Sequence, residues 1–174
     1  MMGSAKRELT AGDLERIHDE HVGAMFRYGL TLLRDETAVR DLLQDVFVKL
    51  AQGRGEGMAA ETERAYLLRM VHHGAIDLMR RDKVRREHAE QQPAETIFTA
   101  SPDPDREAFR QRLDAALEQL PLEQREVVVL KLWEELTFDE IAGICGIPLN
   151  TAASRYRYGI DKLRALLRPV YEEL

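Results

Sequence analysis

The sequence predicts an all-α protein of two small helical domains joined by an acidic linker, with a helix-turn-helix in the second domain. Three observations support this prediction. Apolar residues recur at helical spacing over most of the 174-residue chain, and a polar, proline-containing stretch interrupts them over residues 87–107. Near the C-terminus, a capped short helix is followed by a glycine and a longer basic helix.

Composition excludes several other classes of protein. Five Phe, five Tyr and one Trp are too few for an aromatic-rich sandwich or barrel. No apolar run approaches the roughly 20 residues that span a bilayer, and residues 1–7 lack the apolar core of a signal peptide. We therefore expect a cytoplasmic protein without a membrane partner. Cys145 is the single cysteine, so it forms no internal disulfide and cannot alone make a structural zinc site. We expect no metal and no cofactor.

Three or four helices are expected in the first domain, residues 1–86. The first covers about Leu14–Leu33, where apolar residues recur less cleanly than in the next two. Apolar residues of the second follow the helical template without a miss over Val39–Leu50, and the third repeats the template over Leu67–Leu78. The glycines of Gln52–Gly57 permit turns but no regular element.

The segment over residues 87–107 has the composition of a linker. It contains six acidic residues against Arg106 alone, together with Pro93, Pro102 and Pro104. Helical periodicity resumes in the second domain, residues 108–174, with one helix over Leu113–Leu120 and another running to Trp133 after Pro121.

The helix-turn-helix is the clearest local signature. Thr137 and Glu140 form a capping box before a short helix, Phe138–Cys145, and Gly146 suits its left-handed C-cap. A last helix begins near Pro148 or Leu149 and is expected to end at about Arg168, before Pro169. The residues expected to pack inward are Ile141, Ala142, Ile144, Ile147, Ala152, Tyr156, Ile160, Leu163 and Leu167. The alternative is a helical hairpin that binds only protein.

Charge is unevenly distributed along the chain. The net charge of −6 counts against a nucleic-acid partner, but residues 80–86 contain five bases against Asp82, and residues 150–168 contain five against Asp161. The two basic clusters predict two DNA contacts on either side of the acidic linker.

Three motifs resemble those of bacterial RNA polymerase sigma factors. Residues 108–168, including Leu120–Val127 and Thr137–Ala142, resemble the fourth domain of that family. Asp41–Phe47 resembles the polymerase-binding helix of the second domain, and Tyr66–Val71 with Ala75–Arg81 resembles its promoter-reading helix. Because only a short linker joins the two domains, the chain resembles the extracytoplasmic-function (ECF) class.

The resemblance implies a non-enzymatic subunit that binds core RNA polymerase, at the β′ clamp and the β flap, and recognises and melts promoter DNA. An anti-sigma factor is a further implied partner. The implied polymerase-binding residues are Asp41, Gln44, Asp45 and Lys49. The implied contacts to the minus-ten element are Tyr66, Arg69, His72, His73, Arg80, Arg81, Lys83, Arg85 and Arg86. The implied contacts to the minus-thirty-five element are Asn150, Thr151, Ser154, Arg155, Arg157 and Lys162.

Several residues depart from the family pattern. Many members have asparagine at His73, an aromatic residue at Gly53, and basic residues at Ala153 and Tyr158. Tyr66 either stacks on a base or is a half-buried core residue. These departures leave the base specificity open.

Two other classes of function compete with the sigma-factor interpretation. A stand-alone helix-turn-helix regulator, with the first domain as a partner or dimerisation module, needs neither the Asp41–Phe47 motif nor the basic Arg80–Arg86 run. An enzyme would need a phosphate-binding loop, a nucleophile elbow or a metal cluster, and the sequence contains none of these patterns.

Overall fold

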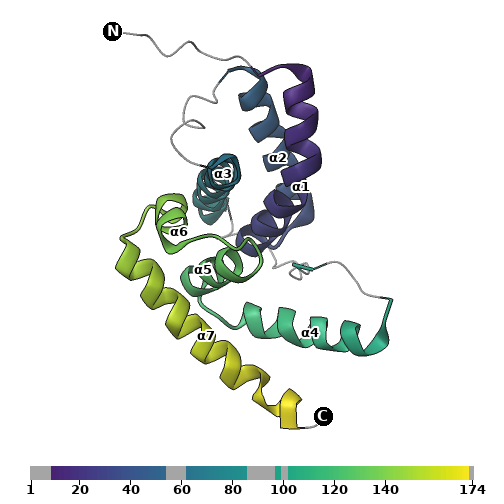
Figure 1. The fold of residues 1–174 in the computed structure, drawn as a ribbon, viewed down its shortest axis with the longest axis vertical. Coiled ribbons are helices and arrows are strands. Elements are labelled where there is room, and N and C mark those ends of the chain that lie inside the picture. The colour runs from purple at the N-terminus through teal and green to yellow at the C-terminus, as the bar shows by residue number, and fades with distance from the viewer. Residues whose placement is uncertain (1–8, 54–61, 86–96, 99–101, 173–174) are drawn as a thin grey trace.

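The computed structural model describes residues 9–53, 62–85, 97–98 and 102–172, and every regular element within these ranges is an α-helix. The helices are α1 (Ala11–Leu33), α2 (Glu36–Ala51), α3 (Glu63–Arg85), α4 (Pro104–Glu118), α5 (Leu122–Leu132), α6 (Phe138–Cys145) and α7 (Leu149–Glu172). Figure 1 shows α1–α3 at one end of the molecule and α4 and α7 at the other, with α5 and α6 between them. Within the described ranges, no helix combines the length and apolar character needed to cross a bilayer.

Helices α1, α2 and α3 form the N-terminal half, and each contacts the other two. The expected apolar stripe of α2 is confirmed, since Val39, Leu42, Leu43, Val46 and Leu50 are all buried. Gly74 of α3 lies against Leu42, so closely that an added Cβ would come 2.3 Å from the leucine Cδ1. A side chain at position 74 would therefore require the Leu42 side chain to move.

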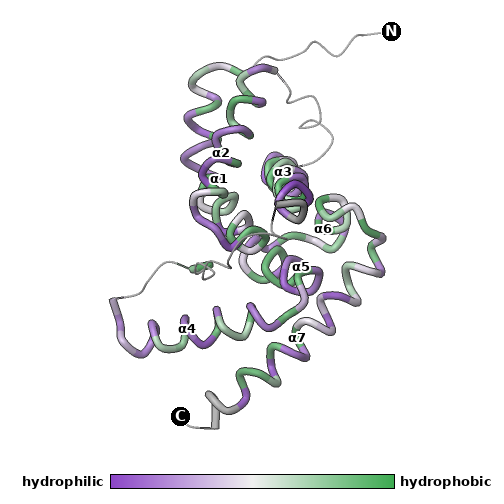
Figure 2. Tube along the Cα trace, turned by 180° about the vertical axis from the view of Figure 1, so that it is seen from behind, coloured by the Kyte–Doolittle hydropathy of each residue, from purple (hydrophilic) through white to green (hydrophobic). Residues whose placement is uncertain are grey.

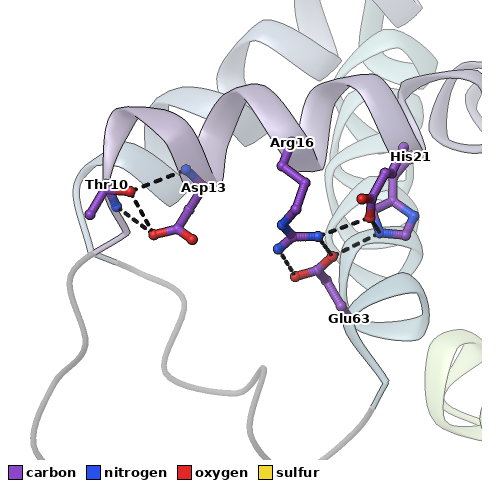
Figure 3. Close-up of polar contacts among 6 residues, drawn as sticks. Thr10, Asp13, Arg16, His21 and Glu63 are labelled. Atoms are coloured by element: carbon purple, nitrogen blue, oxygen red, sulfur yellow. Dashed lines mark hydrogen bonds and ion pairs between the residues drawn. The ribbon is translucent and has the colours of Figure 1, made fainter.

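A polar clamp fixes α1 to the start of α3 (Figure 3). The guanidinium of Arg16 donates from both terminal nitrogens to the two carboxylate oxygens of Glu63, at 2.9 and 2.8 Å. Nε2 of His21 lies 2.8 Å from Oε1 of the same carboxylate. One turn before Arg16, Thr10 and Asp13 form a capping box that starts α1. The clamp therefore fixes the start of α3 against α1.

Helices α4–α7 form the C-terminal half. The predicted capping box of Thr137 and Glu140 is confirmed, and Gly146 adopts the left-handed conformation with φ 65°. Helix α7 therefore follows the Gly146 turn, as predicted. Figure 2 shows hydrophilic and hydrophobic residues alternating along α7. Ala152, Leu163 and Leu167 of the predicted inward stripe are buried, and Tyr156 and Ile160 are half-buried.

Two helix boundaries differ from the prediction. Helix α4 begins at Pro104, inside the expected linker, because Asp103 caps it and proline is favourable in the first turn, where its missing N–H is not needed. Helix α7 continues through Pro169 to Glu172, so the expected end near Arg168 was wrong. A proline removes one backbone hydrogen bond, and this loss has not ended the helix.

Two residues of the expected linker are anchored to the C-terminal half. The Ile97 amide donates to both carboxylate oxygens of the buried Asp114, at 3.1 and 3.2 Å, and its side chain is buried. The Phe98 carbonyl accepts a 3.0 Å hydrogen bond from Arg110, and its ring lies 5.0 Å from that of Trp133. Ile97 and Phe98 are therefore docked on the C-terminal half, although the composition around them is that of a linker.

The two halves pack on each other where α1 and α3 meet α5 and α6, a surface that we call the seam. One apolar cluster crosses it and contains Leu67 and Val71 from α3 together with Val127, Ile141 and Ile144 from the C-terminal half. Both views show α6 beside α3 (Figures 1 and 2). The predicted two helical domains are thus in direct contact and share a core.

Candidate nucleic-acid and partner interface

The outer edge of α2 carries the predicted polymerase-binding residues. Asp41, Gln44, Asp45 and Lys49 are all exposed, on the side opposite the buried stripe. The helix is held at its start by Asp35, whose carboxylate accepts from the amide of Ala38 at 3.0 Å. Rigid packing beneath this edge keeps two carboxylates and an amide in a fixed array that can meet a basic partner.

Tyr66 at the start of α3 is a core residue, with only 6% of its surface exposed. The guanidinium of Arg69 lies 5.6 Å from its ring centroid, within cation–π range. Of the two alternatives for Tyr66, the structure shows the buried one, so base stacking would require the ring to be uncovered.

His72 is buried, which contradicts its predicted place on an outward face of α3. Only 8% of the residue is exposed, and its Nδ1 lies 2.9 Å from the Tyr28 hydroxyl and 3.6 Å from a carboxylate oxygen of Glu126. Burial, with a smaller effect from the charge of His73, lowers the pKa of His72 to about 4. The apolar spacing in α3 indicates which face packs against α1 and α2. It does not reveal that the C-terminal half covers a second face, the one that carries His72.

The remaining predicted residues of α3 lie farther along the helix. His73, Arg80 and Arg81 are exposed. Lys83 and Arg85 belong to α3 but their side chains lie outside the described part, and Arg86 lies outside the described residues. The exposed arginines extend from the seam toward the C-terminal end of α3 and can contact a phosphate backbone.

The start of α7 presents a polar outer face. Asn150 is exposed, Thr151 and Ser154 are half-buried, and the Ser154 hydroxyl donates to the carbonyl of Asn150 at 2.8 Å. Arg157 is exposed and lies 5.0 Å over the ring of Tyr158, which is 57% exposed. This pair forms an exposed cationic surface near the start of α7.

Arg155 and Lys162 differ in their freedom to meet DNA. Lys162 is exposed, one turn beyond Tyr158. Arg155 is half-buried and turns toward α5, where its guanidinium lies 3.8 Å from Glu123 and 3.8 Å from Glu126. In this arrangement Arg155 therefore neutralises acidic residues of α5.

Sequence reasoning missed the polar contacts that join the halves. Glu134, 1% exposed in the loop after α5, accepts a 2.6 Å hydrogen bond from Nε of Arg27 and a second from Arg64. The Thr62 hydroxyl also donates across the seam to Glu140, at 3.0 Å. No local pattern marks Glu134, because its partners lie 107 and 70 positions earlier in the chain.

Comparison with known proteins identifies the family. The family model described as Sigma-70 region 2 matches residues 17–85, and that described as Sigma-70, region 4 matches residues 110–163. The RNA polymerase sigma factor CarQ of Myxococcus xanthus is 31% identical over 136 residues, which are 78% of either chain. The ECF RNA polymerase sigma factor SigL of Mycobacterium tuberculosis is 29% identical over 168 residues, covering 95% of this chain and 94% of that one. The chain belongs to the ECF sigma factors.

Solved structures share the fold. The sigma factor RpoE of Bartonella quintana, in complex with the anti-sigma factor NepR, has a TM-score of 0.74 at 20% identity, covering 91% of this chain and 98% of that one. CnrH, in complex with the cytosolic domain of CnrY, has a TM-score of 0.66 at 21% identity, covering 92% and 90%. The family models and the sequence relatives show that this protein is an RNA polymerase sigma factor, a transcription initiation factor that acts with RNA polymerase on promoter DNA.

Proposed function

We propose that this ECF sigma factor docks on the β′ clamp of core polymerase through the outer edge of α2. The observation that supports this assignment is the exposure of Asp41, Gln44, Asp45 and Lys49 on one rigid helix edge. Opposite charges on two pre-formed surfaces accelerate encounter and fix the register of the complex. We further propose that the C-terminal half binds the β flap.

The two basic surfaces would then contact the two promoter elements. Arg80 and Arg81 of α3, continuing into Lys83, Arg85 and Arg86, would follow the backbone near the minus-ten element, with His73 and Arg69 beside the opened bases. Asn150, Thr151, Ser154 and Arg157 would meet base edges of the minus-thirty-five element, with Lys162 on phosphate. His72 would become available only if the halves separate, because it faces Glu126 across the seam, whereas Arg155 is held by Glu123 and Glu126 within the C-terminal half.

An anti-sigma factor is a further proposed partner. Support comes from the two structural neighbours, RpoE and CnrH, since RpoE is described in complex with the anti-sigma factor NepR and CnrH with the cytosolic domain of CnrY. No cofactor or catalytic group enters the proposal.

Replacing Asp45 with lysine tests the docking assignment. Asp45→Lys reverses the charge at the centre of the α2 edge, so we expect affinity for purified core polymerase to fall at least about tenfold, the effect of roughly 1.4 kcal/mol. Affinity of the isolated chain for promoter DNA should be unchanged or higher, because a negative charge is lost. Fluorescence anisotropy with labelled core polymerase and with a promoter fragment would measure both.

Asp19→Lys is the matched control, since Asp19 is an exposed carboxylate on α1 of the same half. It should leave core affinity intact. Equal core affinity for the wild type and Asp45→Lys would contradict the assignment of α2.

A further inference from the structure

Three potential metal ligands from three helices converge in the seam. His72 comes from α3, Glu126 from α5 and Cys145 from the last position of α6. One donor atom of each lies within 4.8 Å of the other two. The three residues are far apart in the chain, so only the packing of the two halves assembles the group.

The group is buried and poorly neutralised. Glu126 is 5% exposed and His72 is 8% exposed. The Glu126 carboxylate has the neutral imidazole of His72 at 3.6 Å from one oxygen and the guanidinium of Arg155 at 3.8 Å from the other. Both separations exceed a good hydrogen bond, which leaves the Cys145 thiol as a hydrogen-bonding partner of the carboxylate, and a buried charge that is not closely paired with a cation is costly. Burial accordingly raises the pKa of Glu126 to about 7 and raises the pKa of the Cys145 thiol.

The donor set matches the chemistry of zinc. Thiolate sulfur, imidazole nitrogen and carboxylate oxygen are its usual protein ligands, in contrast to the all-oxygen sets that calcium and magnesium prefer. A tetrahedral ion with ligands about 2.0–2.3 Å away separates its ligand atoms by roughly 3.3–3.8 Å. The 3.6 Å between Nδ1 of His72 and Oε2 of Glu126 falls within that range. The Tyr28 hydroxyl lies 2.9 Å from the same Nδ1 of His72, so this hydrogen bond is given up when Nδ1 coordinates the ion.

A second group of possible ligands, Glu20, His21 and Glu63, is a weaker candidate. Arg16 donates to both of its carboxylates, so a guanidinium already occupies the position of a cation. That group contains no thiol and lies within one half, where its occupancy would not affect the seam.

We propose that His72, Glu126 and Cys145 bind a zinc-like divalent cation that holds the seam closed. Binding releases to solvent the Cys145 thiol proton and any proton carried by Glu126, and it needs no redox step. Because α3 is tied to α5 and α6 through the ion, the bound state keeps His72 away from DNA. This consequence for transcription rests on the proposed function, whereas binding of the ion does not.

Cobalt(II) is a spectroscopic probe for the site. The full-length chain, reduced and freed of metal with a chelator, would be titrated with Co²⁺ under anaerobic conditions. We expect a thiolate-to-cobalt charge-transfer band and visible tetrahedral bands that saturate at one ion per chain and disappear on addition of Zn²⁺. Since Cys145 is the single cysteine, the charge-transfer band reports on this site alone.

Variants separate the ligands from their neighbours. Cys145→Ser should abolish the charge-transfer band, and His72→Gln should weaken binding by more than the roughly 10- to 100-fold that loss of an outer-shell partner costs. His73→Gln, at the adjacent exposed position, is the matched control and should bind as the wild type does. Circular dichroism without metal would show whether each variant is folded. A folded wild type that gives no thiolate band with excess Co²⁺ would overturn the proposal.

Hydrogen exchange tests the effect on the seam. Zn²⁺ should slow amide exchange in α3, α5 and α6 of the wild type and have no effect in Cys145→Ser. Equal slowing in both proteins would contradict a site at Cys145. Normal transcription without a cobalt–thiolate band would refute the metal site and leave the sigma function intact. A cobalt–thiolate band from a chain that supports no transcription would uphold the metal site and refute the sigma function.

Discussion

The neighbouring guanidinium of Arg16 extends the pH range over which Glu63 stays ionised. Hydrogen bonds from Arg16 are the main cause that lowers the pKa of Glu63 to about 2, with a smaller effect from His21, while partial burial acts in the opposite direction. In the unfolded chain the same carboxyl titrates near 4.5. Since the folded pKa is the lower one, the clamp stabilises the fold fully above about pH 5 and loses this contribution as the pH falls toward 2.

Glu63→Gln should remove this pH-dependent contribution. We expect the variant to be less stable than the wild type at neutral pH by on the order of 1 kcal/mol or less, because solvent screens a pair whose Arg16 and Glu63 side chains are 44% and 26% exposed. The difference should shrink as the pH falls from about 5 to 2. Urea denaturation across this range would measure it. In an Arg16→Gln background the Glu63→Gln difference should be largely lost, and a difference that persisted there would assign it to another partner.

Arg157 and Arg164 provide a matched pair on α7. Arg157 lies on the polar face at the helix start, whereas Arg164 is exposed farther along and lies 3.8 Å from Asp161. With core polymerase bound, Arg157→Ala should weaken promoter selection by roughly 1–3 kcal/mol if it contacts a base, and Arg164→Ala should have little effect. Competition between promoter fragments with altered upstream elements would measure it. A change in salt dependence alone would make Arg157 a phosphate contact.

At the scale of the helix, a single glycine controls how α7 approaches α5. A Cβ added at Gly159 would lie 2.7 Å from Cγ2 of Val128, which is fully buried, and 3.3 Å from Cβ of Gln124. Gly159→Ala should therefore reduce the free energy of unfolding by about 1–3 kcal/mol, the usual cost of overpacking. Chemical denaturation would measure it.

Gly143 in α6 supplies the control for Gly159. An added Cβ meets nothing within 4 Å there, and the residue is exposed on a helix. Gly143→Ala should raise stability by roughly 0.5–1 kcal/mol, because alanine loses less backbone entropy on folding. Similar losses for both variants would show that overpacking against Val128 is not the cause.

Local signals explain why the helix-turn-helix was predictable. The capping box of Thr137, the left-handed Gly146 and the inward stripe of α7 each depend on residues within a few positions of one another. Short-range chemistry also fixed the register of α2. The end of α7 was misjudged because a proline lowers helix stability without setting a boundary when the flanking turns continue.

At the scale of the whole molecule, the packing of the two halves along the seam could not be predicted from the sequence. His72, Glu134 and Arg155 owe their surroundings to partners in helices that are distant in the chain. From its local sequence alone, each would be assigned to solvent or DNA. The polymerase-binding and DNA-binding roles stay predictions, but the structure shows that two of the predicted DNA contacts, His72 and Arg155, face Glu126 in the seam.

Glu134 is the main polar contact across the seam, so its charge should influence whether the halves separate. Glu134→Gln leaves Arg27 and Arg64 without their carboxylate, and we expect the seam to weaken by about 1–3 kcal/mol. Amide exchange in α6 should accelerate, and the isolated chain should bind promoter DNA more tightly. Glu135→Gln, the exposed neighbour in the same loop, should change neither. Faster exchange without tighter DNA binding would show that the seam does not restrict access.

The anchoring of Ile97 on Asp114 has a consequence for reach. Twelve peptide steps separate Arg85 from Ile97, and fully extended they span about 40 Å. If Ile97 and Phe98 detach, the free tether runs to Asp103, and eighteen steps extend to about 60 Å. The hydrogen bond between the Ile97 amide and the Asp114 carboxylate therefore shortens the connection between the two halves. It limits how far apart two DNA sites can lie if one chain is to contact both.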